Sequence, residues 1–278
     1  MIYVVLAPIA LASAYYIVPK VIGRPVYSYS LAVMGFWALI IFGGWSGMNR
    51  YMGGPLPAWM PTIGSAASIL LLFPGFAVLY NLIKTLGDKA SWANHSPALR
   101  FTLFGVVSFV VMIFLGVLLS RFDTGTTLQF THTQTGFDLL ATYGFFSMTI
   151  FGAIYFIVPR ITGCEWANAK QIRFHFWFSA YGIGTIVMFM IVAGLTQGHV
   201  INKFNEPFID SVERSRPYLG GLVLGWAFIV VSNISFLFQL GKMALRLGRR
   251  DADGPTLIHK DPEDYFSEQL ANKEGANA

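Results

Sequence analysis

Charged residues are scarce in this sequence: Asp, Glu, Lys and Arg make up 12% of its 278 residues, against about a quarter in an average soluble domain. Hydrophobic residues make up 55%. A water-soluble fold of this length could not cover its surface with so few charges, so the soluble classes are excluded. The net charge of +5 comes from basic residues at the ends of apolar runs, which indicates membrane topology and no nucleic-acid partner.

Residues that carry chemistry are equally few. Cys164 is the one cysteine, which excludes an internal disulfide and a thiolate metal cluster built from this chain alone. The sequence contains no phosphate-cradling glycine loop, no nucleophile elbow and no pair of histidines at metal-binding spacing. It opens on apolar residues without a basic stretch before them, so no cleavable signal peptide is predicted. No catalytic class follows from these residues alone.

What the sequence has instead is long apolar runs. Each is about 18 to 25 residues long, enough for a helix to cross a hydrocarbon layer of about 30 Å. We therefore predict an all-α, polytopic membrane helix bundle with about seven transmembrane helices. The runs cover residues 1–18, 29–49, 61–85, 99–121, 137–158, 171–195 and 217–243.

Lys and Arg are distributed unevenly between the two sides of such a bundle. The side richer in these residues is expected to be cytoplasmic. This places the C-terminus in the cytoplasm and Met1 outside, at the start of a span with no anchoring charge, so we expect that the chain lacks a preceding part. Residues 1–247 form the predicted membrane domain. Residues 248–278 are acidic and poor in apolar side chains, which predicts a polar, disordered cytoplasmic tail.

An internal repeat relates the first and fifth runs at a constant offset of about 140 residues. Both copies end in Pro followed by a basic residue on the same predicted side, which indicates a parallel repeat of helix pairs. A simpler explanation is that Pro-basic pairs often end a span and that Phe-Trp suits the aromatic belt. The shared residues are Tyr15, Ile17, Val18, Pro19, Gly23, Phe36 and Trp37, matched by Tyr155, Ile157, Val158, Pro159, Gly163, Phe176 and Trp177.

Five histidines are the candidate ligands, because heme and copper in membrane helices need imidazoles aimed at the bundle interior. His95 and His259 lie in predicted cytoplasmic segments and are expected to be solvated. His199, at the outer end of the sixth run, is expected to be interfacial, and His175, near its inner end, to pack by a hydrogen bond. His132, in the polar segment before the fifth run, has the best position for a ligand, with a solvated loop histidine as the alternative.

Asp138 is the one carboxylate inside a predicted span, near its outer end. Acids at such depth are candidate functional residues. The alternative is that Asp138 caps the start of its helix. A transporter could use such an acid, but other charges inside the predicted spans are nearly absent, which argues against that class.

Five sequence blocks resemble the catalytic subunit I of cbb-type cytochrome c oxidases, the C-family of heme-copper oxidases. They are residues 15–20 (YYIVPK), 24–29 (RPVYSY), 36–40 (FWALI), 152–160 (GAIYFIVPR) and 175–177 (HFW). The resemblance runs from Met1 to about Leu247 and would correspond to the last seven of that subunit's twelve helices. It implies helix arcs with internal rotational symmetry, a low-spin heme, a high-spin heme, a copper ion and the reduction of dioxygen.

The copper-site positions implied by the resemblance carry other residues in this chain. The family has two adjacent copper-binding histidines in a Trp-x-Gly-x-His-His segment, whereas residues 45–48 (WSGM) are followed here by Asn49 and Arg50. The redox-active tyrosine of the family, two residues before that tryptophan, matches Gly43. Copper in this chain is therefore not expected.

The heme-ligand positions also differ. Two family histidines, spaced by one residue, match Phe137 and Leu139, neither of which can ligate iron. A shifted alignment with an insertion would place His132 and Gln134 there, whereas Gly144 fits the ungapped register. The remaining ligands belong to family helices that precede Met1. The resemblance thus leaves His132 as the one candidate ligand for a heme b.

Two hypotheses follow from the resemblance. In the first, the chain is a subunit I-like component of a cbb-type oxidase, serving electron transfer to oxygen without a complete heme-copper centre of its own. Its partners would be other oxidase subunits, a chain supplying the front five helices, and the lipid bilayer of a bacterial inner membrane. In the second, it is a non-catalytic scaffold or assembly paralogue in a respiratory membrane complex.

Overall fold

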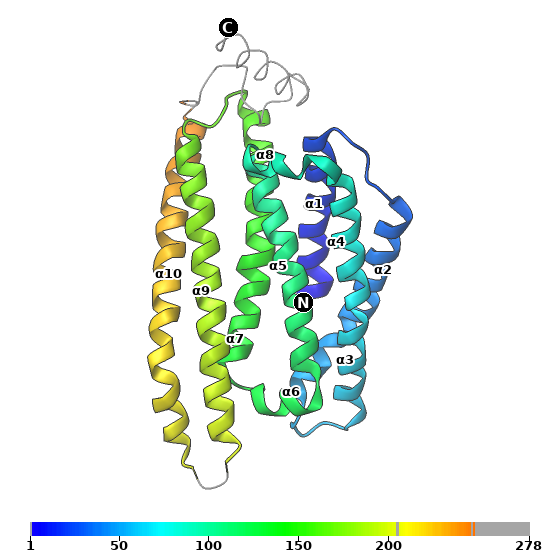
Figure 1. The fold of residues 1–278 in the computed structure, drawn as a ribbon, viewed down its shortest axis with the longest axis vertical. Helices are drawn as coiled ribbons and strands as arrows, with labels where there is room; N and C mark the ends of the chain where they lie inside the picture. Colours follow the sequence, from blue (N-terminus) through cyan, green and yellow to red (C-terminus); the bar gives the residue numbers. More distant parts are fainter. Residues whose placement is uncertain (1, 204–205, 246, 248–278) are drawn as a thin grey trace.

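The computed structural model describes residues 2–203, 206–245 and 247, which fold into a bundle of long helices lying side by side (Figure 1). The predicted tail, residues 248–278, lies outside the described residues. Within the described part, seven helical segments are long and apolar enough to cross a membrane, one for each predicted run. They are Ile2–Ile22, Tyr29–Tyr51, Trp59–Ala93, Pro97–Ser120, His132–Thr162, Ala169–Ile201 and Phe208–Ala244.

Several of these spans are composite. The third bends at Leu71, and the fifth contains a π-helical stretch. The elements are η1 (Ile2–Leu6), α1 (Ala7–Ile22), α2 (Tyr29–Ser46), η2 (Gly47–Tyr51), α3 (Trp59–Leu70), α4 (Leu72–Leu86), η3 (Gly87–Asn94), α5 (Pro97–Ser120), α6 (Phe122–Leu128), α7 (His132–Leu139), η4 (Leu140–Ser147), α8 (Met148–Thr162), α9 (Ala169–Ile201) and α10 (Phe208–Ala244).

The internal repeat is visible in the backbone. Helices α1 and α8 run in the same direction (Figure 1) and carry Pro19 and Pro159 near their ends. Each then stops at a left-handed glycine, Gly23 (φ 71°) or Gly163 (φ 65°), whose N–H donates to the proline carbonyl at 2.9 Å. Only glycine adopts this conformation without strain. A π-helical segment, η1 or η4, precedes both helices, so the repeat extends further than the matched residues indicated.

Glycines allow the helices to approach closely, as is common where helices pack in a membrane. On α5 and α8 the contacts are reciprocal: Gly105 lies against Thr149, and Gly152 against Thr102. Helices α9 and α10 form a hairpin whose main contact is between its own two arms. Helix α5 lies at the centre of the rest, packed against α1, α3, α4 and α8, and its C-terminal half contributes Gly116 and Leu119 to a cavity.

Candidate functional site

The cavity begins at the C-terminal end of α2, where the chain tightens into the 3-10 helix η2. This short helix carries Asn49 and Arg50. Gly64 of α3 has no side chain and lets the Asn49 backbone come close, because a Cβ at Gly64 would collide with the Asn49 nitrogen. The Asn49 amide also donates to Ser68 Oγ at 3.0 Å. These two contacts fix η2 on α3 and direct Arg50 toward α7.

Arg50 is the hub of a polar cluster. Its guanidinium forms a two-pronged ion pair with Asp138 of α7, with Nη1 at 3.3 Å from Oδ2 and Nη2 bonded to Oδ1. When the Gln134 amide is oriented to satisfy both its atoms, its oxygen accepts from Arg50 Nε at 2.9 Å and from Nη2 at 2.8 Å. The guanidinium carbon also lies 5.4 Å from the centre of the Phe137 ring. One turn of α7 therefore surrounds the arginine with a carboxylate, an amide and an aromatic face.

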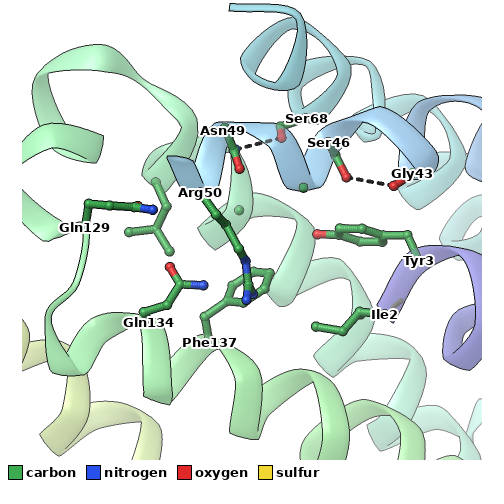
Figure 2. A pocket seen from close by; sticks show the side chains of 13 residues that line it. Ile2, Tyr3, Gly43, Ser46, Asn49, Arg50, Ser68, Gln129, Gln134 and Phe137 are labelled. Carbon is green, nitrogen blue, oxygen red and sulfur yellow. Dashed lines mark hydrogen bonds between the residues drawn. The ribbon is translucent and has the colours of Figure 1, made fainter. Parts of the chain in front are cut away.

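The cavity beside this cluster measures about 200 Å³ and is lined by residues of η1, α2, η2, α3, α5 and α7 (Figure 2). Tyr3 of η1 extends across it, with its hydroxyl pointing toward Arg50 (Figure 2). The Tyr3 side chain fits there because Gly43 has none: a Cβ at Gly43 would lie 2.5 Å from Tyr3 Cβ. The Tyr3 hydroxyl also approaches Gly116 of α5, at 3.2 Å from the place of a Cβ.

The structure brings together most positions that the resemblance assigned to metal chemistry. Gly43, Asn49, Arg50 and Phe137 all line this one cavity. Leu139 does not, and packs instead beside the buried apolar cluster between α9 and α10. Four sites chosen by matching sequence blocks thus converge in space, although they lie on two segments far apart in the chain.

Asp138, the candidate intramembrane acid, lies in the second turn of α7 and pairs with Arg50. The helix begins at His132, with Thr131 in the cap position, so Asp138 does not cap it as the alternative required. The side chains of Arg50 and Asp138 are 37% and 42% exposed, so water screens part of their attraction. No local sequence pattern marks this pairing, because 88 positions separate the two residues.

The histidines lie away from the cavity. His132 is the first residue of α7 and not part of a loop; its N–H donates to Gln197 Oε1 of α9 at 3.1 Å. His175 is fully buried, and its Nδ1 shares a 2.8 Å hydrogen bond with the Tyr155 hydroxyl, in agreement with the expected packing role. Its ring stacks on Phe236 at 5.0 Å.

The other two described histidines have exposed positions. His199 lies in the last turn of α9, and His95 follows η3. His259 lies outside the described residues. The buried Cys164 is on the opposite side of the bundle from the cavity, near the end of α8.

The residues of the cavity do not fit heme iron or copper. In the described part of the chain, no group of three or more His, Cys, Asp or Glu side chains could hold a metal ion. These metals are bound mainly by imidazole, thiolate or thioether groups and more rarely by a tyrosine oxygen. The side chain at the copper-histidine position here is a guanidinium, which has no lone pair to offer and whose positive charge repels a metal cation. Its volume of about 200 Å³ is also below the roughly 300–1,000 Å³ of sites for cofactor-sized molecules.

The fold defines a class of membrane protein. A solved heme-copper terminal oxidase dimer matches it with a TM-score of 0.73 over 92% of this chain and 50% of that one, at 15% sequence identity. The likeness at this identity concerns the fold alone. The chain is thus an integral membrane protein with the helix arrangement of heme-copper oxidases.

Sequence comparison gives the family. Residues 1–228 match the family described as cytochrome c and quinol oxidase polypeptide I, and the chain belongs to this family. It is 30% identical over 238 residues to a cytochrome c oxidase subunit 1 homolog of Agrobacterium tumefaciens, covering 81% of this chain and 44% of the relative. It is 29% identical over 230 residues to the cbb3-type cytochrome c oxidase subunit CcoN1 of Stutzerimonas stutzeri, covering 78% and 48%. The chain therefore spans about half the length of the curated relatives it matches.

Proposed function

We propose that this chain works as a subunit I-like component of a cbb-type cytochrome c oxidase and does not itself contain a complete heme-copper centre. One observation carries the second part of the proposal. At the position where the resemblance implies a copper-binding histidine, the Arg50 guanidinium is bound to the Asp138 carboxylate. A guanidinium has no free lone pair and is not deprotonated in proteins, so it cannot act as a metal ligand.

The partners we propose are other oxidase subunits and a chain that supplies the front five helices. The proposal is supported by the names of the relatives, which describe each of them as one subunit of a cytochrome c oxidase. Such a partner could contribute its own histidines. It could not supply the groups that are absent at Asn49, Arg50 and Phe137, so oxygen reduction at a centre of the family type would need a second, intact subunit.

We place the chain in a bacterial inner membrane with its C-terminus in the cytoplasm. The placement rests on the excess of Lys and Arg on the side where α1 and α8 end, among them Lys20 and Arg160. The Arg50 cavity then lies in the outer half of the membrane. Cysteine-accessibility labelling of Ile209→Cys and Gly241→Cys, near opposite ends of α10, tests this orientation.

The experiment for oxidase membership is purification from the native membrane. A tagged chain, extracted in a mild detergent, should migrate with other oxidase subunits in a native gel, as identified by mass spectrometry. Migration as an isolated polypeptide would contradict the proposal. The alternative, a scaffold or assembly paralogue, predicts the same partners but oxygen consumption with reduced cytochrome c that does not change when this chain is removed.

We propose His132 as a ligand of a heme b. Because one histidine supplies at most one axial bond, a partner chain would supply the other. Replacing His132 by Ala should then remove one heme band from the spectrum of the purified complex. His199→Ala is the matched control, because His199 is exposed on the same outer side. An unchanged spectrum for His132→Ala would show that His132 does not bind heme and only forms the first residue of α7.

A further inference from the structure

We infer that Arg50, Asp138 and Gln134 take the structural place of metal-ligand bonds, fastening η2 to α7 so that the chain folds without heme or copper. The inference rests on the proposal that the centre is incomplete in this chain. Beyond that proposal, we infer that the polar side chains at the changed positions are bound by other side chains of this chain and stabilise its fold.

Three positions along the cavity that differ from the family pattern each contact a residue that compensates the difference. The charge of Arg50 is balanced by Asp138, and the amide of Asn49 is bound to Ser68 at 3.0 Å. At Gly43 the missing side chain is replaced by the Tyr3 ring, which passes over it. A metal site that had merely lost its ligands would leave charged and polar side chains without partners. Here charge, hydrogen bond and volume are each compensated by a different element.

The location of the cluster explains why it matters for the fold. On one side of the cavity η2 packs on α3, and on the other α7 packs on α9. Arg50 reaches across and joins the two groups. In a metal site, one ion binds ligands from several helices and holds them together in the same way. The bidentate guanidinium-carboxylate pair gives a directional bond with defined geometry, which suits it to this role.

The proposal predicts a non-additive response to mutation. Removing one member of the pair leaves the other charge uncompensated in a partly buried place, whereas removing both leaves no charge without a partner. Arg50→Met and Asp138→Asn should therefore each lower the thermal unfolding midpoint by several degrees. The double variant should lie no lower than the worse single variant.

The chain offers a matched control. Arg121 and Asp123 are also oppositely charged and near the outer side, but their closest atoms are 3.8 Å apart and their side chains are 63% and 88% exposed. Arg121→Met, Asp123→Asn and their combination should leave the midpoint nearly unchanged. The proposal is overturned if the effects of Arg50→Met and Asp138→Asn simply add, or if they are as small as those of the control pair.

A second measurement needs no variant and decides the matter even if the Arg50 variants do not accumulate. The unaltered chain is produced in cells that cannot make heme, with and without added hemin. We expect the same yield of monodisperse protein and the same midpoint in both cultures. A higher yield or midpoint with hemin would overturn the inference.

Failure of this inference can be distinguished from failure of the proposed function. A chain that folds without hemin but never migrates with oxidase subunits keeps the structural inference and loses the oxidase assignment. A chain that migrates with oxidase subunits but is stabilised by hemin keeps the assignment and loses the inference.

Discussion

The contact between α5 and α8 makes a quantitative prediction, because Gly105 leaves no room for a side chain. A Cβ at Gly105 would collide with Thr149 Oγ1 and lie 3.0 Å from the Phe145 carbonyl oxygen. Thr149 is fully buried, so neither helix can yield without moving its neighbours. Gly105→Ala therefore overpacks the interface, at a cost of about 1–3 kcal/mol. The better helix propensity of Ala offsets roughly 0.5–1 kcal/mol of this.

Together these two terms leave a net loss of about 0–2.5 kcal/mol, which corresponds to a fall in the unfolding midpoint of up to roughly 10 °C, at about 2–4 °C per kcal/mol for a chain of this order of size. Cys164, the one cysteine, provides the assay. It is buried, so a dye that fluoresces on reaction with thiols reports unfolding in detergent. Adding Thr149→Ala to Gly105→Ala removes the colliding Oγ1 and should raise the unfolding midpoint part of the way back to that of the unaltered chain.

The control is Gly184→Ala, since nothing lies within 4 Å of a Cβ at this exposed position of α9. Its midpoint should be unchanged or slightly higher, because only the helix propensity changes. If Gly105→Ala unfolds at the same temperature as Gly184→Ala, the close packing of α5 on α8 is refuted.

Three further predictions follow. Asn81 is fully buried and bonds both the N–H and the C=O of Ser28 at 3.0 and 2.8 Å, so Asn81→Ala should destabilise the start of α2 by about 1–3 kcal/mol, as measured by the unfolding midpoint. Cys164 should not react with a soluble maleimide in the folded protein and should react fully after denaturation, as counted by mass spectrometry. The hydrogen bond from Lys203, followed by the charge of a neighbouring arginine, holds the pKa of Glu206 below its ordinary value. The contribution of the ionised Glu206 to folding stability is thus complete at neutral pH, and it is lost as the pH falls from about 4.3, the ordinary pKa of Glu, through the lower pKa of the folded state. Hydrogen exchange at the adjoining end of α10 should become faster over this pH range. Glu206→Gln should remove this pH dependence.

Much of the fold could be predicted from the sequence because a bilayer imposes a simple rule. Each apolar run must be helical and about long enough to cross, so all seven predicted runs correspond to helical spans. The ends were less predictable. The fifth span begins at His132 and not at Phe137, because its first turn is polar and is held by contacts with α9, such as the bond from His132 N–H to Gln197.

The candidate site was predictable only in part. Matching sequence blocks assigned Gly43, Asn49, Arg50 and Phe137 to family metal-site positions without predicting their contacts, and in the structure all four line one cavity. The partners that complete the site were not foreseen. Tyr3 fills the space at Gly43 through a steric fit between two helices, and no local pattern marks such a fit.

The pairing of Arg50 with Asp138 was missed for a related reason. The sequence places Asp138 inside a span and Arg50 at a copper-histidine position of the family, but it does not say which charges meet. A partner 88 positions away is determined by the packing of η2 on α3 and by the turn of α7 that faces it. The π-helical segment η4 adds to the difficulty, because it changes which side chains of the fifth span share a face.

The heme content of this chain tests the central claim most directly. The protein would be purified alone and with its co-purifying partners, and a pyridine hemochrome spectrum and a reduced-minus-oxidised spectrum would be recorded for both samples. The account predicts no stoichiometric heme in the isolated chain, with any heme confined to the preparation that contains partners. One heme per polypeptide in the isolated chain would contradict it.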